Sequence, residues 1–251
     1  MTTSSGLPYR ITDSKGYPFV HYEVPSRSEH EMQARASSFR DDLAKRRSVR
    51  HFSDRPVPAE LIRTAVASAA SAPPGAHLQP WTFVTVSDFE TRHAIRIAAE
   101  KEEQENYDGG RMPPQWREVL EPLGTDADKS FYDRVPWIVV VFEQRHGYFP
   151  DGSHKEHYYV KESVGIACGM FVAAIHNMGL ATLTHTPSPM RFLTEILGRP
   201  NNESPYLVFP VGYPAEDAYV PEISRKPLPD VLVEFGPRKP PDDLSAEVAV
   251  E

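Results

Sequence analysis

The chain is organised around the segment Ala44-Lys45-Arg46-Arg47-Ser48-Val49-Arg50, in which three arginines surround one hydroxyl group. Guanidinium groups are planar and permanently charged, and their N–H donors match the oxygens of a phosphate monoester. A short basic run of this kind is otherwise typical of a solvated helix end. The segment therefore predicts either a phosphate site or an ordinary charged surface.

A second segment, further along the chain, favours the phosphate site. It reads Ala72-Pro73-Pro74-Gly75-Ala76-His77-Leu78-Gln79-Pro80-Trp81. Its prolines stop a helix and free backbone N–H groups, and Gly75 allows that backbone to approach a ligand closely. Together, the two segments resemble the signature of the FMN-dependent nitroreductase superfamily.

Within that superfamily, the chain most resembles the iodotyrosine deiodinases, from about Arg46 to Leu228. The segments that carry this resemblance are Arg46-Arg47-Ser48-Val49-Arg50, Gly75-Ala76-His77, Pro80-Trp81-Thr82-Phe83-Val84, residues 103–107, His157-Tyr158-Tyr159, Ser163, Ile166-Ala167-Cys168-Gly169, Gly198-Arg199-Pro200, Pro210-Val211-Gly212-Tyr213-Pro214 and Arg225-Lys226-Pro227-Leu228. So many matches in the same order are not expected by chance. The resemblance implies an α+β fold with a mixed central sheet flanked by helices, assembled as an intertwined homodimer with two FMN sites at its interface.

The resemblance also implies how FMN is bound. The implied FMN-binding residues are Arg46, Arg47, Ser48, Val49, Arg50, Pro74, Thr184, His185, Thr186 and Arg225. The arginines and the Ser48 hydroxyl would face the flavin phosphate, and the segment 184–186 would face the ring, with Thr186 near N5 as the catalytic residue. His185 and Pro74 each stand where this family leads us to expect a hydroxyl residue. His185 therefore changes the polarity expected at one edge of the ring, and Pro74 removes one expected FMN contact.

A carboxylate, a phenol and an ammonium group are the candidates for substrate binding. Glu103 and Tyr107 are four residues apart and so share one face of a helix, and Lys129 follows a long polar stretch. In the deiodinases such a trio recognises the halotyrosine zwitterion. The resemblance also implies that the Ala76 N–H would donate to the substrate phenolate. Taken alone, Glu103 and Lys129 are more typical of solvent-facing charges on a charged helix. The spacing from Tyr107 to Lys129 is about one residue longer than the family leads us to expect.

Hydrophobic residues at helical spacing predict the helices, and short β-branched or continuous apolar runs predict the strands. The predicted helices span residues 29–45, 58–72, 89–106, 160–178 and 191–197. The predicted strands span residues 81–86, 137–142, 181–184, 206–211 and 231–235. Gly165, Ala167 and Gly169 leave room on the fourth helix for another backbone, which favours packing of this helix on its copy in a second subunit.

The 251 residues read as one domain with irregular ends. Residues 1–28 predict an extended N-terminal arm, 29–235 the FMN domain, and 236–251 a disordered tail that is rich in proline and then acidic. Within the domain, we expect a lid at about residues 100–130, because residues 108–128 are rich in glycine, proline and charge.

Composition excludes several other classes of function. The formal net charge of −8 opposes nucleic-acid binding, which needs an excess of basic residues. Cys168 is the only cysteine, so no internal disulfide or cysteine-rich metal site is expected, and His154 and His157 lack the carboxylates of a metal site. No apolar run is long enough to cross a bilayer, and the first residues lack a signal-peptide pattern. We therefore expect a cytoplasmic protein without a metal.

The leading hypothesis is an FMN-dependent reductive dehalogenase of iodo-, bromo- or chlorotyrosine. NAD(P)H or a reductase protein would supply its electrons. The alternative is a broad nitroreductase or quinone reductase that uses NAD(P)H, which has no need for a zwitterion site made by Glu103, Tyr107 and Lys129. A non-catalytic sensor of flavin or tyrosine is the third possibility.

Overall fold

A four-stranded antiparallel sheet forms the centre of the molecule. The computed structural model describes residue 2 and residues 6–236. The strands lie in the order β3 (Trp81–Val86), β4 (Trp137–Gln144), β8 (Glu203–Gly212) and β7 (Ala181–Thr182). The register places Val84 opposite Val140, which lies opposite Val208 on its other side. Residues 138–142 are fully buried, as expected for a strand covered on both faces.

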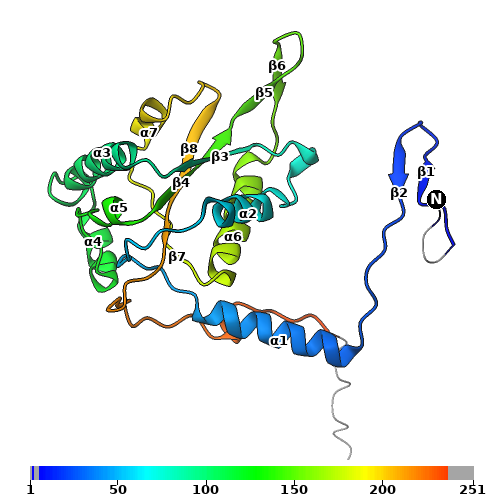
Figure 1. Ribbon diagram of the computed structural model, residues 1–251, viewed down its shortest axis with the longest axis horizontal. Helices are drawn as coiled ribbons and strands as arrows, with labels where there is room; N and C mark the ends of the chain where they lie inside the picture. Colours follow the sequence, from blue (N-terminus) through cyan, green and yellow to red (C-terminus); the bar gives the residue numbers. More distant parts are fainter. Residues whose placement is uncertain (1, 3–5, 237–251) are drawn as a thin grey trace, which may run out of the picture.

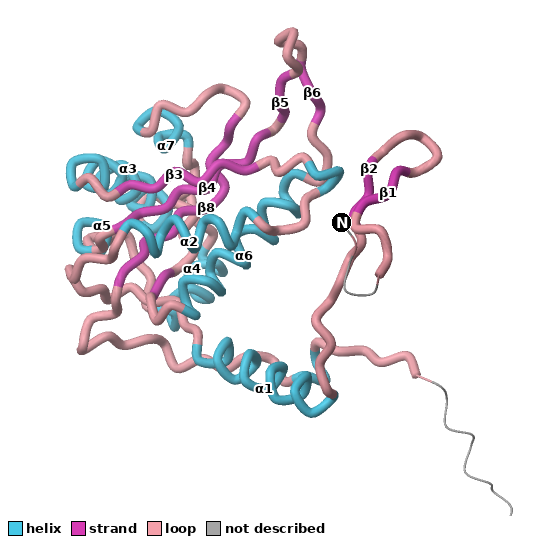
Figure 2. Tube along the Cα trace, turned by 45° about the vertical axis from the view of Figure 1, so that its right-hand side comes forward, coloured by secondary structure: helices cyan, strands magenta, loops and turns pink. Residues whose placement is uncertain are grey.

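Helices cover both faces of this sheet (Figures 1 and 2). One face carries α3 (Phe89–Tyr107), α5 (Phe131–Arg134) and α7 (Arg191–Ile196), and the other carries α2 (Ala59–Ala70) and α6 (Val160–Asn177). Alternate residues of β4 point to opposite faces. Accordingly Val140 belongs to the core cluster under α3, and Val139 and Val141 belong to the cluster under α2 and α6.

The longest helices begin and end at recognisable signals. The Asp88 carboxylate accepts the Thr91 N–H at 2.8 Å and so caps the start of α3. On α6, the Phe171 ring packs 5.9 Å from the Phe83 ring and 5.1 Å from the Phe209 ring, which fixes this helix on the sheet. Gly179, with φ 76°, ends α6 in the left-handed conformation that glycine adopts without strain.

Several elements project from this body (Figure 1). The hairpin of β1 (Arg10–Thr12) and β2 (Pro18–Val20) stands apart from it, and β5 (His146–Tyr148) pairs with β6 (His154–Glu156) in a second hairpin. Helix α1 (Glu29–Lys45) has no buried residue, and the C-terminal segment runs alongside it. That segment includes the short turn η3 (Leu228–Asp230). These elements leave large apolar side chains exposed, among them Tyr22 at 83% and Phe235 at 98%.

The predicted α+β class is confirmed, as are the helices and most strands. The named strands pair only antiparallel within residues 2 and 6–236, and the parallel component of the sheet is a single bridge between Ser48 and Thr182. The strand predicted at 231–235 is wrong for the single chain, because these residues find no strand to pair with in its described part. The predicted disordered tail lies outside the described residues, apart from Gly236.

Candidate functional site

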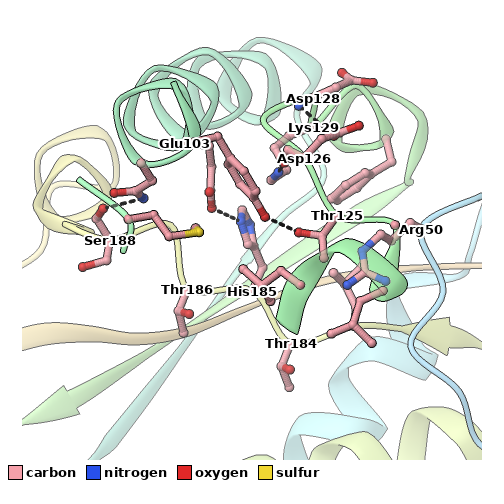
Figure 3. A pocket seen from close by; sticks show the side chains of 18 of the residues that line it. Arg50, Glu103, Thr125, Asp126, Asp128, Lys129, Thr184, His185, Thr186 and Ser188 are labelled. Carbon is pink, nitrogen blue, oxygen red and sulfur yellow. Dashed lines mark hydrogen bonds and ion pairs between the residues drawn. The ribbon is translucent and has the colours of Figure 1, made fainter. Parts of the chain in front are cut away.

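A larger cavity, of about 910 Å³, lies between α3, the segment after it and the residues that follow β7 (Figure 3). It gathers many of the residues that the sequence singled out. Those that line it are Arg50, Glu103, Tyr107, Lys129, Thr184, His185 and Thr186. Carboxylate, ammonium, phenol and hydroxyl groups from distant parts of the chain therefore face one space.

Three side chains form a hydrogen-bonded chain at the wall of this cavity. His185 Nε2 lies 2.9 Å from Glu103 Oε1 (Figure 3). On the other side of the ring, His185 Nδ1 lies 2.5 Å from the Tyr132 hydroxyl. Tyr132 is fully buried, and burial raises its pKa well above the usual value. Burial also lowers the pKa of His185, against the opposing effect of its hydrogen bond to Glu103. With a neutral imidazole, all three groups are satisfied when the phenol donates to Nδ1 and Nε2 donates to Glu103.

Lys129 is held by the end of the segment that closes the cavity. Its side chain is buried, and its Nζ donates to the carbonyl of Asp126. Burial lowers the pKa of Lys129, while Glu103 and Asp126 act in the opposite direction. Its Nζ lies 5.9 Å from the centre of the Tyr107 ring, and the Tyr107 hydroxyl lies 2.5 Å from Thr125 Oγ1.

The backbone of Lys129 is anchored to α3 by Glu100. Glu100 Oε1 accepts the Lys129 N–H and the Arg96 Nε–H, each at 2.9 Å. Replacement of Glu100 with Ala is expected to lower the free energy of unfolding by about 1–2 kcal/mol, since both donors lose their acceptor. Urea unfolding measures the change. The exposed Glu60→Ala, also on a helix and paired at 3.3 Å with Arg63, is the control. Equal losses in the two variants would contradict an anchoring role.

The segment 108–128 is more ordered than its composition suggests. It contains α4 (Pro114–Leu120) and the turn η2 (Glu121–Leu123), which the sequence analysis missed. Arg111 ties it to α3 through Glu102 at 2.8 Å, and Met112, Trp116 and Thr125 line the cavity. Trp116 is nonetheless 66% exposed. The segment thus covers the cavity while resting on few buried contacts of its own.

The smaller cavity, of about 460 Å³, contains the other part of the arginine segment. Arg46, Arg47 and Val49 line it together with Thr182 and the end of α6. Arg225 lies outside this cavity but donates to the carbonyls of Ala44, at 2.9 Å, and Arg46, at 2.6 Å. Burial lowers the pKa of Arg46, and the neighbouring charges that lower it further are Arg225 and Arg47. Such crowded cations favour a bound anion.

The two cavities share the same pair of adjacent segments. The Val49 N–H donates to the Thr182 carbonyl at 3.3 Å, so residues 46–51 run beside β7 and the residues after it. Arg46 and Arg47 face the smaller cavity, whereas Arg50 faces the larger one. Within one chain the three guanidinium groups are therefore divided between the cavities. Ser48 is exposed and lines neither.

Pro74 and Ala76 lie apart from both cavities in the single chain. They belong to the turn around η1 (Gly75–His77), where Ala76 has φ 48°. The Gly75 N–H donates to Ser163 Oγ at 3.1 Å, near the start of α6, whereas the smaller cavity adjoins the end of α6. The 18 residues of α6 span about 27 Å. One chain therefore does not bring the two organising segments together.

The residues that the sequence analysis missed support the ones that it found. Tyr132 lies beneath His185, Glu100 holds Lys129, and Thr125 contacts Tyr107. None belongs to a motif, and their partners are distant in the sequence, so no local pattern could identify them. In residues 2 and 6–236, His, Cys, Asp and Glu side chains form no group of three that could hold a metal ion. No helix in that part of the chain is long and apolar enough to cross a membrane.

Comparisons with known proteins identify similar sequences and structures. The model of the nitroreductase family matches residues 43–213. An iodotyrosine deiodinase from Haliscomenobacter hydrossis is 50% identical over 217 residues, which cover 86% of this chain and 97% of that protein. One from Danio rerio is 43% identical over 225 residues, covering 88% and 75%. A crystal structure of oxidized iodotyrosine deiodinase bound to FMN and 3-iodo-L-tyrosine superimposes with a TM-score of 0.69 at 26% identity, covering 80% of this chain and all of that one.

Proposed function

The chain belongs to the nitroreductase family and, within it, to the iodotyrosine deiodinases, and we propose that it is an FMN-dependent enzyme that removes halide from halogenated tyrosines. One observation of the structure supports this proposal most. The larger cavity is lined by the carboxylate of Glu103, the ammonium of Lys129 and the phenol of Tyr107. This set complements a free amino acid, which carries one ammonium and one carboxylate.

The residues of the arginine segment fit FMN as the cofactor. Arg46 and Arg47 supply crowded cations at the smaller cavity for the phosphate end, with Arg225 fastened beside them. Arg50, Thr184 and Thr186 supply a guanidinium and hydroxyls at the larger cavity for the polar edge of the ring. Reduced FMN, when bound, supplies the electrons that break the carbon–halogen bond. Each turnover replaces that bond with a C–H bond, consuming two electrons and one proton and releasing halide.

The protein side of the reaction is recognition and exclusion of water. Glu103 accepts the substrate ammonium, and Lys129 and Tyr107 donate to its carboxylate. Both Glu103 and Lys129 are already largely buried, at 8% and 5% exposure, so their cost of desolvation is met by folding before the ligand arrives. Closure of residues 108–128 over the amino acid then removes the remaining water from these charges.

We further propose a homodimer, because one chain leaves its site incomplete. Ala76 lies at one end of α6 and the smaller cavity at the other, so an antiparallel pairing of two α6 helices would bring the Ala76 turn of one subunit to the arginine segment of the next. The exposed Gly169 leaves room for close approach on this helix and the exposed Ile166 offers an apolar contact, whereas Ala167 is buried in its own core. The Ala76 N–H would then face the substrate phenolate. Light scattering that shows a monomer at micromolar concentration would contradict the dimer.

Substrate is expected to protect the lid from proteolysis. Trypsin can cleave after Arg111 and Arg117, which lie in exposed parts of the segment 108–128. Iodotyrosine added at about 100 times its Kd to the FMN-loaded protein should slow these cleavages by about 10-fold or more, because cleavage requires local opening. Mass spectrometry of the fragments measures the rate. Cleavage after Arg35 on α1 is the control, and equal protection there would contradict a lid.

The function itself is tested by anaerobic reduction of the purified FMN protein with dithionite, followed by iodotyrosine. Halide release with flavin reoxidation supports the proposal. Rapid reoxidation by nitroaromatics alone supports a broad nitroreductase, and binding without turnover supports a sensor. Titration with NADH, NADPH and candidate reductases identifies the electron donor, for which we propose NAD(P)H or a reductase protein. The cytoplasmic location stays a prediction, which cell fractionation tests.

A further inference from the structure

His185 connects the carboxylate of Glu103 to a phenol beneath the cavity. Its imidazole is 11% exposed and uses both ring nitrogens, Nε2 at 2.9 Å from Glu103 Oε1 and Nδ1 at 2.5 Å from the Tyr132 hydroxyl. A threonine or serine at this position would be too short to reach both groups. We infer that His185 is a positioning residue, which holds Glu103 in the orientation that receives the substrate ammonium. This inference rests on the proposed function.

The direction of each hydrogen bond follows from the chemistry of the three groups. The Tyr132 phenol is fully buried and keeps its proton, so it donates to Nδ1. Nε2 then carries the single proton of a neutral imidazole and donates it to Glu103. One tautomer of His185 satisfies both hydrogen bonds. Tyr132 is enclosed in the core and fixes the plane of the imidazole ring. The carboxylate is thereby fixed through Oε1.

Fixing Glu103 in this way also affects how it interacts with the ammonium group of Lys129. Glu103 and Lys129 are opposite charges on largely buried side chains, and Glu103 shifts the pKa of Lys129 upward, toward its charged form. Yet the structure gives each a separate partner: Glu103 binds His185, and Lys129 donates to the Asp126 carbonyl. If the two charges bound each other instead, a zwitterionic ligand would first have to break their ion pair. His185 therefore keeps the carboxylate available to the ligand.

The main chain at His185 is held by hydrogen bonds that do not involve its side chain. Its backbone N–H donates to the Val208 carbonyl at 2.9 Å, and its carbonyl accepts the Val208 N–H at 3.0 Å. These main-chain bonds attach residue 185 to the central strand β8 whichever side chain it carries. Substitutions at 185 should consequently leave the chain folded and test recognition alone.

The experiment compares two ligands on three variants. The ligands are 3-iodotyrosine and 3-(4-hydroxy-3-iodophenyl)propionate, which has no amino group, and calorimetry on the oxidised FMN protein measures each Kd without turnover. His185→Phe, which removes both hydrogen bonds, is expected to weaken iodotyrosine about 10-fold and the propionate less than about 2-fold. His185→Gln, whose amide N–H can still reach Glu103, should recover most of that loss. Tyr132→Phe, which removes only the hydrogen bond to His185 Nδ1, should weaken iodotyrosine binding about 3-fold.

A purely structural role predicts a different pattern. Equal weakening of both ligands in His185→Phe, or no recovery in His185→Gln, would overturn the inference while leaving halide release by the wild-type protein, and so the proposed function, in place. A wild-type protein that neither binds iodotyrosine nor releases halide would overturn both. Imidazole ¹⁵N NMR of the wild-type protein gives an independent readout. The ring of His185 should be neutral and protonated at Nε2, and the opposite tautomer would contradict the proposed direction of the chain.

Discussion

Replacement of both Arg46 and Arg47 with Gln is expected to weaken FMN binding by about 100-fold or more, so that the protein is purified colourless. Each guanidinium that meets a phosphate dianion makes charge-assisted hydrogen bonds worth about 1.5–3 kcal/mol, and two such losses combine to at least that factor. In the folded chain the cations around Arg46 repel one another, since Arg47 and Arg225 both lower its pKa. The anion relieves this repulsion, which increases its contribution to binding.

The measurement is a flavin titration of the apoprotein, with bound FMN followed by its fluorescence. The control is the double variant Arg63→Gln and Arg191→Gln, which removes the same charge from exposed ion pairs on α2 and α7. An unchanged FMN affinity in the Arg46 and Arg47 variant would place the phosphate elsewhere. Circular dichroism separates loss of FMN from loss of fold, because the Arg47 side chain also donates to the Pro221 carbonyl.

The sequence predicted those parts of the fold whose buried faces appear as a local pattern of apolar residues. Strand β4 is a continuous apolar run because helices cover both its faces, and α6 repeats apolar residues at helical spacing up to Gly179. The hairpin of β5 and β6 was not predicted, because its six strand residues show no apolar pattern and none of them is buried. Helix α4 was hidden for a related reason: its segment is rich in glycine, proline and charge, and none of its residues is buried.

The residues of the site also differ in whether a local pattern could predict them. The family resemblance pointed to Glu103, Tyr107 and Lys129, and the structure brings them to one cavity although the segment 108–128 separates Tyr107 from Lys129. The role of His185 was not predicted, since its contact with Tyr132 joins residues 53 positions apart and belongs to no motif. Nor could the sequence place Ala76, which lines neither cavity in one chain. Its assignment depends on a second chain, and so on symmetry rather than on local pattern.

Replacement of Glu103 with Gln is expected to raise the Kd for iodotyrosine by about 30- to 100-fold, with little effect on FMN. Glu103 is 8% exposed, so an ammonium bound there makes a charge-assisted hydrogen bond screened from water, worth about 2–3 kcal/mol. Gln keeps the shape of the side chain and one oxygen acceptor but removes the charge. The amide N–H of the Glu103→Gln variant could donate to His185 Nε2 only if the imidazole proton moved to Nδ1. That change of tautomer would disturb the hydrogen bond between Nδ1 and Tyr132.

Two comparisons isolate the ammonium as the cause. The propionate analogue, which has no amino group, should bind wild-type protein and Glu103→Gln within about 3-fold of each other, because the lost charge has no partner on this ligand. Glu102→Gln, one residue away on α3 and paired with Arg111 at 2.8 Å, is the matched variant and should leave iodotyrosine binding within about 2-fold. A loss of iodotyrosine affinity that is as large in Glu102→Gln as in Glu103→Gln would assign the effect to the net charge of the helix. A parallel loss of FMN from Glu103→Gln would instead assign it to a general loosening of the cavity.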